Sequence, residues 1–192
     1  MNRILNRQRG FSLIEIIIVV AIVLVISGMA IPMVASIVQN FRTGGDARDL
    51  NSAILVAKMR ASSDYAQTRL HADMNTNTFW VEVQPSGSAG WTMEGGQQFL
   101  SRNVSFGYDS LTAPPSGTQT AIAQATACPG INNSACIRFN SRGIPVDNTN
   151  APYSNYAIYL TDGKSVSAVT VSVTGVTLIW RTDISAANWI KR

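Results

Sequence analysis

Residues 8–38 read QRGFSLIEIIIVVAIVLVISGMAIPMVASIV, and the rest of the chain is organised around this stretch. A polar, basic segment ends at Gly10, and a long apolar run begins at Phe11. Residues 16–26 are uninterrupted apolar residues, and one carboxylate, Glu15, lies just before them. As a helix, residues 11–38 would be about 42 Å long, more than the ~30 Å hydrocarbon core of a bilayer.

Three interpretations compete for this run. A cleaved secretory signal would use the small-x-small sequence at 28–30, but the apolar run continues past it. An uncleaved signal anchor tolerates the length but gives no role to Glu15, whose charge costs roughly 2.5–3.5 kcal/mol at the centre of a bilayer. Such a carboxylate normally has a partner. Basic residues before the run predict that the N-terminus stays inside and that the C-terminal domain lies outside.

The third interpretation supplies the partner. The sequence from Gly10 to Glu15 (GFSLIE), behind a basic leader, resembles the class III signal of type IV pilins and type II secretion pseudopilins. In that family a membrane peptidase cuts after the glycine and methylates the new N-terminal amine, so the resemblance places cleavage at Gly10 and methylation at Phe11. Glu15 of one subunit could then neutralise the amine of its neighbour in an apolar environment, and this pair would fix the axial register of assembly.

Gly28 and Pro32 are predicted to weaken one turn of the helix. Proline lacks a backbone N–H, and its ring clashes with the carbonyl four residues earlier, which belongs to Gly28. A kink is therefore expected in the membrane. In pilins the corresponding segment often loses helical structure when subunits pack into a filament; a kink without a function is the alternative.

The sequence after the apolar run predicts a second half of the helix. Residues 44–46 (GGD) indicate a local break, with Asp46 capping a resumed helix. Apolar residues at spacings of three and four then predict an amphipathic helix that ends near Thr68 and packs on a sheet. These residues are Leu50, Ala53, Ile54, Ala57, Ala61 and Tyr65.

After residues 73–77 the apolar period changes to two, which predicts strands. The strands are expected at 79–83, 103–108, 136–140, 156–160, 165–173 and 176–181, with a long surface loop at 110–135. A long helix followed by an antiparallel sheet is an α+β fold, and this order matches the pilin fold. The predicted divisions are a leader at 1–10, a transmembrane half-helix at 11–38, an amphipathic half-helix at 39–70 and a β-rich headgroup at 71–192.

A second resemblance covers much of the headgroup. The helix sequence 49–61 (DLNSAILVAKMRA), the aromatic strand at 79–80 and the strand at 137–139 followed by Gly143 are similar to the GspH/FimT group. That group contains minor pseudopilins of type II secretion and minor pilins of type IV pili. The long 110–135 loop departs from its pattern.

Cys128 and Cys136 are predicted to form one local disulfide, because the N-terminus indicates export to an oxidising compartment. The absence of a CxxC motif and of a nearby histidine argues against a metal site. Such a short disulfide loop contributes about 2–3 kcal/mol in the chain-entropy model. Two free thiols in a cytosolic loop are the alternative.

The charge pattern argues against a general nucleic-acid binder. Of the fifteen basic residues, three lie in the leader, which leaves twelve against eleven acidic residues. A nucleic-acid-binding protein usually has a concentrated basic face. The exception is the C-terminal end, where Arg181, Lys191 and Arg192 are candidate DNA contacts for a minor pilin of DNA uptake.

No catalytic constellation is visible. His71 is the only histidine and is expected at a helix end, and neither a phosphate loop nor a calcium loop is present. We therefore expect no enzyme, no cofactor and no metal; a membrane-anchored periplasmic enzyme would have no candidate residues.

The sequence therefore predicts a minor pilin or pseudopilin in the inner membrane with its headgroup outside. Its expected partners are a prepilin peptidase and N-methyltransferase, other pilin subunits, an inner-membrane assembly platform and the lipid bilayer. A DNA-binding minor pilin of a competence pilus is the alternative function.

Overall fold

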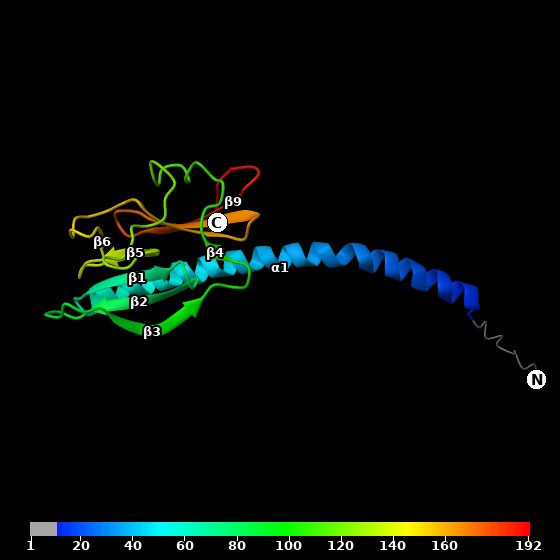
Figure 1. The fold of residues 1–192 in the computed structure, drawn as a ribbon, viewed down its shortest axis with the longest axis horizontal. Coiled ribbons are helices and arrows are strands. Elements are labelled where there is room, and N and C mark those ends of the chain that lie inside the picture. Colours follow the sequence, from blue (N-terminus) through cyan, green and yellow to red (C-terminus); the bar gives the residue numbers. More distant parts are fainter. Residues whose placement is uncertain (1–10) are drawn as a thin grey trace, which may run out of the picture. The chain divides into compact units, whose positions relative to one another are not determined.

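The computed structural model describes residues 11–192, apart from the side chains of residues 31–33, 35 and 36. The chain forms two units, of which the first ends at Val38 and the second is Gln39–Arg192. One helix, α1 (Leu13–Ser63), is followed by strands only, so the chain has the predicted α+β class (Figure 1).

The strands form two antiparallel five-stranded sheets instead of the single predicted sheet. Sheet A has the order β3-β2-β1-β5-β6 and contains β1 (Gln67–Asp73), β2 (Thr78–Gln84), β3 (Thr92–Phe99), β5 (Ser134–Phe139) and β6 (Pro145–Val146). Sheet B has the order β10-β9-β8-β7-β4 and contains β4 (Ser105–Phe106), β7 (Tyr156–Thr161), β8 (Ser165–Val171), β9 (Thr177–Asp183) and β10 (Ile190–Lys191).

The predicted helix break at residues 44–46 is wrong, because α1 is continuous through it. Each glycine costs about 1 kcal/mol relative to alanine in a helix, but burial of the following apolar stripe outweighs this preference. Leu50 and Ile54 in that stripe are fully buried. Asp46 does not cap a helix; its carboxylate accepts hydrogen bonds from the backbone N–H and the hydroxyl of Ser101, at 2.9 and 2.8 Å.

The predicted helix end near Thr68 is also wrong. α1 ends at Ser63, and Tyr65 adopts a φ of +49°, which a right-handed helix cannot continue. Gln67 already begins β1, so the boundary predicted between residues 70 and 71 falls inside a strand. His71 consequently lies in the middle of β1 and not at a helix end.

The main core joins α1 to both sheets. Leu70, Phe79 and Ile137 from sheet A and Ile158 and Val169 from sheet B pack in one cluster with the apolar stripe of α1. The alanines of that stripe allow a close approach of sheet A. The Thr68 hydroxyl donates to the Ala57 carbonyl at 2.7 Å.

Polar side chains also connect α1 to both sheets. The Thr43 hydroxyl donates to the Asp162 carboxylate at 2.8 Å, at the turn between β7 and β8. Fifteen residues further along the chain, Lys58 Nζ donates to the Gly175 carbonyl at 2.9 Å, at the turn between β8 and β9. Together with Asp46, these bonds are distributed along the helix and do not cluster at one end.

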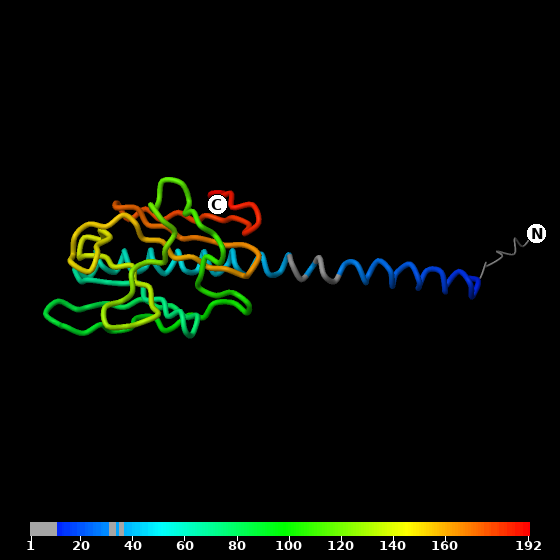
Figure 2. Tube along the Cα trace, turned by 45° about the horizontal axis from the view of Figure 1, so that its top comes forward, coloured from blue at the N-terminus to red at the C-terminus, as the bar shows by residue number. Residues whose placement is uncertain are grey.

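The segment between β4 and β5 is not simply a surface loop. It lies beside sheet B in both views (Figures 1 and 2) and packs Leu111 against Tyr159 in a second apolar cluster. The Tyr159 hydroxyl donates to Gln119 at 2.6 Å, and the Gln124 amide bonds both backbone groups of Tyr159 at 2.9 Å. Trp189 completes this cluster from the C-terminal end. This segment therefore gives sheet B a buried second face.

Candidate processing and assembly site

The described chain starts immediately after the predicted cleavage point, since Gly10 lies outside the described residues. Phe11 is 78% exposed and precedes the first helical turn. The Ser12 carbonyl accepts hydrogen bonds from the backbone N–H groups of Glu15 and Ile16, at 3.1 and 3.2 Å. Glu15 thus lies in the first turn of α1, where the helix dipole favours a negative charge.

The helix behind Glu15 is apolar and uncovered. Leu13–Ala30 has a mean hydropathy of 2.9 and is long and apolar enough to cross a membrane. None of this span is buried within the described chain. Glu15 has no ion-pair partner among the residues that the structure describes. An exposed surface of this kind requires lipid or other apolar helices around it.

The predicted weak turn lies within this helix. The backbone is helical from Gly28 through Pro32, and nothing lies within 4 Å of the position that a Cβ at Gly28 would occupy. The side chain of Pro32 lies outside the described residues. Loss of helical structure in an assembled state stays a prediction.

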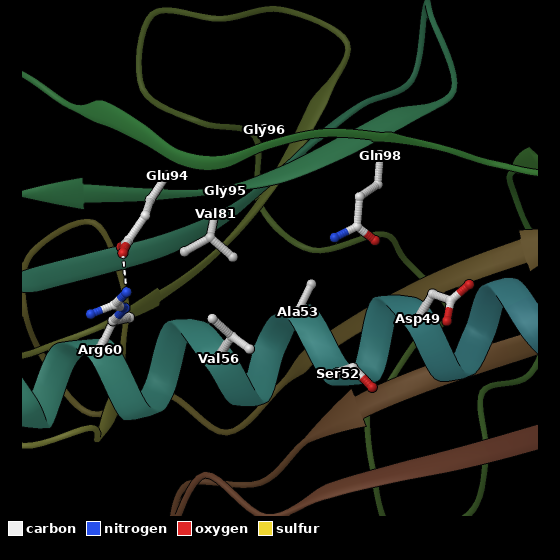
Figure 3. Close-up of a pocket in the computed structure, with 10 residues that line it drawn as sticks. All are labelled: Asp49, Ser52, Ala53, Val56, Arg60, Val81, Glu94, Gly95, Gly96 and Gln98. Atoms are coloured by element: carbon white, nitrogen blue, oxygen red, sulfur yellow. Dashed lines mark ion pairs between the residues drawn. The ribbon is translucent and has the colours of Figure 1, made fainter.

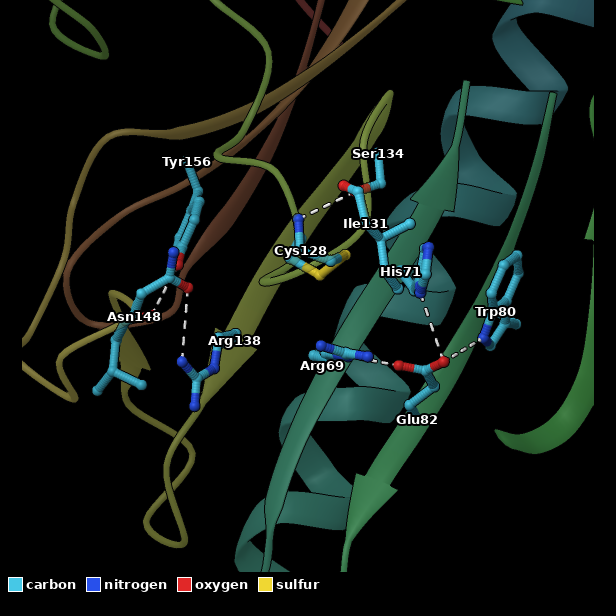
Figure 4. The surroundings of a disulfide bond; sticks show 12 residues. Arg69, His71, Trp80, Glu82, Cys128, Ile131, Ser134, Arg138, Asn148 and Tyr156 are labelled. Carbon is cyan, nitrogen blue, oxygen red and sulfur yellow. Dashed lines mark hydrogen bonds and ion pairs between the residues drawn. A yellow bond between two sulfur atoms is a disulfide. The ribbon is translucent and has the colours of Figure 1, made fainter. Parts of the chain in front are cut away.

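The disulfide between Cys128 and Cys136 is present, with both residues 1% exposed and their Cα atoms 5.0 Å apart. A hydrogen bond inside the loop stabilises it: the Cys128 backbone N–H donates to the Ser134 hydroxyl at 3.0 Å. The loop is also fastened to the β1–β2 turn, where the Met74 N–H donates to the Asn133 carbonyl at 2.9 Å. The disulfide therefore holds the end of the 110–135 segment against sheet A (Figure 4).

A buried ionic cluster on sheet A was not predicted. Figure 4 shows Arg69, His71 and Trp80 converging on Glu82. Arg69 Nε donates to one carboxylate oxygen; Trp80 Nε1 donates to the other at 2.8 Å, and His71 Nδ1 lies 3.4 Å from it. Burial alone raises the pKa of Glu82, but the hydrogen bonds from Arg69 and Trp80, the nearby His71 ring and the charge of Arg69 lower that pKa to about 2. Glu82 is thus a carboxylate held ionised.

Aromatic rings close this cluster. His71 stacks on Trp80 with ring centroids 4.1 Å apart, and the Arg69 guanidinium lies 4.2 Å from the centre of the Trp91 ring. The strand register explains the cluster, since Arg69 is directly opposite Glu82 and His71 is opposite Trp80. The sequence signal for this cluster is the alternation of polar residues in β1 and β2. Only the register between the two strands shows that these residues meet. The Glu82 carboxylate is thus enclosed by Arg69, His71 and Trp80 within sheet A.

The three basic residues at the C-terminal end lie near one another, because β10 pairs with β9 and places Lys191 opposite Trp180, next to Arg181, while Arg181 and Arg192 line one pocket. The Arg181 guanidinium donates to the carbonyl and side-chain oxygens of Asn40, at 3.3 and 2.6 Å, and to the Ser165 hydroxyl at 3.1 Å. It therefore ties β9 to α1. Lys191 and Arg192 are exposed.

The family model that matches this chain covers its N-terminus. Residues 5–31 match the prokaryotic N-terminal methylation motif, and no curated protein matches the chain. Two solved structures of the minor pseudopilin EpsH from the type 2 secretion system of Vibrio cholerae are similar to 72% of this chain. Their TM-scores are 0.48 and 0.44, at 11% and 12% identity, and the alignments cover 95% and 92% of those chains. Similarity at this level carries no functional assignment.

The matched residues contain the second half of the leader, Gly10, Phe11, Glu15 and the whole of the uncovered apolar span Leu13–Ala30. The N-terminal segment of this chain therefore carries the prokaryotic N-terminal methylation motif.

Proposed function

We propose that this chain is a minor pilin or pseudopilin, a structural subunit of a type IV pilus or a type II secretion pseudopilus. Residues 11–38 hold the precursor in the inner membrane with the headgroup outside. A prepilin peptidase cleaves after Gly10 and methylates Phe11. The subunit then enters the filament through α1, on an inner-membrane assembly platform.

The observation that carries this proposal is the position of Glu15. It is a single carboxylate in the first turn of an uncovered apolar helix, within the matched methylation motif. Cleavage after Gly10 creates a cationic amine on Phe11, four residues before Glu15. In an apolar environment an isolated carboxylate is costly, and a nearby ammonium group removes much of that cost. A neighbouring subunit that supplies its amine therefore binds only in the register that pairs the two charges.

The headgroup sequence supports the GspH/FimT type of subunit within this proposal. A DNA-binding role is not proposed, because Arg181 is engaged by Asn40 and Ser165 and leaves only Lys191 and Arg192 exposed at the C-terminal end.

The first experiment is an intact-mass measurement of the full chain extracted from membranes of cells that contain the processing enzyme. We expect loss of residues 1–10, gain of one methyl group and loss of two hydrogens for the disulfide. A mass that retains residues 1–10 would contradict processing.

The second experiment separates insertion from assembly. Glu15→Ala should remain in the membrane fraction but fail to co-sediment with sheared filaments or pseudopili. Ser12→Ala is the matched control, because it removes a polar group from the same turn without removing the charge. Equal incorporation of the two variants would refute the role of Glu15.

A further inference from the structure

Strand β3 is an edge of sheet A, and no strand among residues 11–192 pairs with its outer side. The Leu100 N–H donates to the Asn77 carbonyl at 2.9 Å, so Leu100 directs its backbone groups toward the β2 side. In an antiparallel ladder, adjacent residues of a strand direct their backbone groups to opposite sides. The N–H and C=O of Phe99, the residue before Leu100, therefore face the open edge. Edge strands are usually protected by charges, proline or bulges. The bulge of β3 lies between Glu94 and Gln98, which leaves the end at Phe99 regular. The only charge in β3 belongs to Glu94, and it is paired with Arg60 at 2.5 Å.

A hollow lies beneath the middle of β3. The register between β2 and β3 is interrupted where Trp80 faces the bulge, and Gly95 and Gly96 have φ values of +77° and +85°. No heavy atom lies within 4 Å of the Cβ position of either glycine. The resulting cavity of about 250 Å³ has Ala53 and Val56 of α1 on one side (Figure 3). Neither glycine provides a side chain to fill it.

Apolar side chains flank the position that a further strand would occupy. Val56, beside the hollow on the α1 side of the sheet, is 42% exposed. Met93 and Phe99 of β3 are 48% and 72% exposed. Side chains of a strand alternate between the two faces of a sheet. A strand paired with β3 would therefore contact Val56 on the α1 side of the sheet, and Met93 and Phe99 along β3 itself.

We propose that β3 binds an extended segment of a different subunit as a sixth strand of sheet A, with an apolar side chain in the hollow beside Val56. This is strand addition, in which backbone bonds supply affinity and a side-chain pocket supplies specificity. The inference rests on the proposed function, since the partner belongs to the same filament or pseudopilus.

Charge complementarity identifies the partner further. The hollow is bordered by two carboxylates, Asp49 and Glu94, and by one guanidinium, Arg60, which is already paired with Glu94 and with Asp64 at 3.9 Å. Asp49 has no ion pair in the described part of the chain. The incoming segment should therefore carry a basic residue near its apolar one. A second copy of β3 does not fit, because residues 91–100 (WTMEGGQQFL) contain an acidic residue and no basic one.

The test uses the full chain in cells that assemble the filament, with the photocrosslinker benzoylphenylalanine in place of Phe99. We expect a crosslink to another subunit that maps to an extended segment with an apolar and a basic residue. A crosslink to a helix, to lipid or to a second copy of this chain would overturn the inference. Val176, 54% exposed in the turn before β9, is the spatial control and should give no such product.

A second crosslinker position, Ile22 in the apolar span, reports assembly itself. Crosslinks to other subunits from Ile22 without any from Phe99 would reject the strand and leave the proposed function standing. Absence of subunit crosslinks from both positions would reject the proposed function and the inference together.

Filling the hollow supplies a matched pair of variants. Val56→Phe places a ring in the hollow, whereas Leu55→Phe enlarges a neighbouring helix residue of similar exposure, 38%, that does not line it. Because the pocket provides the burial of one side chain, Val56→Phe should lower the crosslink yield from Phe99 by about tenfold or more. Leu55→Phe should leave the yield unchanged. Equal yields from both variants would contradict the proposed pocket.

Discussion

Replacing Glu82 by glutamine should destabilise the headgroup strongly, because the variant keeps the shape of the side chain but leaves Arg69 buried without its partner. Arg69 and Glu82 have side-chain exposures of 5% and 11%, so solvent screens their interaction weakly. Removing one partner of a buried ion pair costs about 3–5 kcal/mol. The measurement is urea unfolding of Gln39–Arg192, whose core residues all lie within this unit.

The same carboxylate predicts how stability depends on pH. The pKa of Glu82 falls from 4.5 to about 2 on folding, so its contribution is present above pH 4.5 and is lost as the pH falls through 2. At 1.36 kcal/mol per pKa unit, this contribution is at most about 3 kcal/mol. The free energy of unfolding of the wild type should therefore drop more steeply than that of Glu82→Gln between pH 4.5 and 2.

The control for this prediction is Glu94→Gln, which breaks the more exposed ion pair with Arg60. Pairs of that kind contribute about 0–1 kcal/mol. If Glu82→Gln and Glu94→Gln cost the same, or if the wild type and Glu82→Gln lose stability in parallel at low pH, the assignment of Glu82 as a buried, ionised anchor is wrong. Replacing Arg69 and Glu82 together by Met and Leu should recover much of the loss.

Three further predictions concern the same unit. Cys136→Ser should lower the free energy of unfolding by about 2–3 kcal/mol, and reductant should lower it equally in the wild type but not in the variant. Arg181→Ala should cost about 1–3 kcal/mol in urea unfolding through its lost bonds to α1, whereas Lys191→Ala should cost almost nothing. Burial raises the pKa of Asp46, so its carboxylate carries a desolvation cost that an asparagine lacks. Asp46→Ala should lose about 1–3 kcal/mol in urea unfolding, because Ser101 loses both bonds, whereas Asp46→Asn keeps an acceptor and should lose less; equal losses would show that the bonds to Ser101 contribute little.

The sequence predicts best the features that depend on neighbouring residues. The apolar span, the placement of Glu15 and the strands at 79–83, 136–140 and 156–160 follow from local periodicity, and the structure confirms the strands and the disulfide. Of the predicted strand at 103–108, only Ser105–Phe106 forms a strand, because only these residues pair with β7.

The features that depend on distant residues were missed. The predicted amphipathic half-helix includes residues 67–70 of β1, because the apolar spacing of three and four runs to Tyr65; only the pairing with β2 and β5 identifies these residues as part of a strand. β3 contains two adjacent glycines and little apolar alternation, so its sequence has no strand signal. The division into two sheets depends on the pairing of β1 with β5, which are joined by no short turn.

The bonds of Thr43, Asp46 and Lys58 to three separate parts of the headgroup have a mechanical consequence. At 1.5 Å per residue they are spread over about 22 Å of α1. A force directed along the helix axis loads all of them in shear at the same time, together with the core between them. Such a joint yields only when its attachments fail together, whereas a joint fastened at one end peels open one bond at a time. We therefore expect the headgroup to move together with α1, without detaching from it, when a force acts along the helix axis.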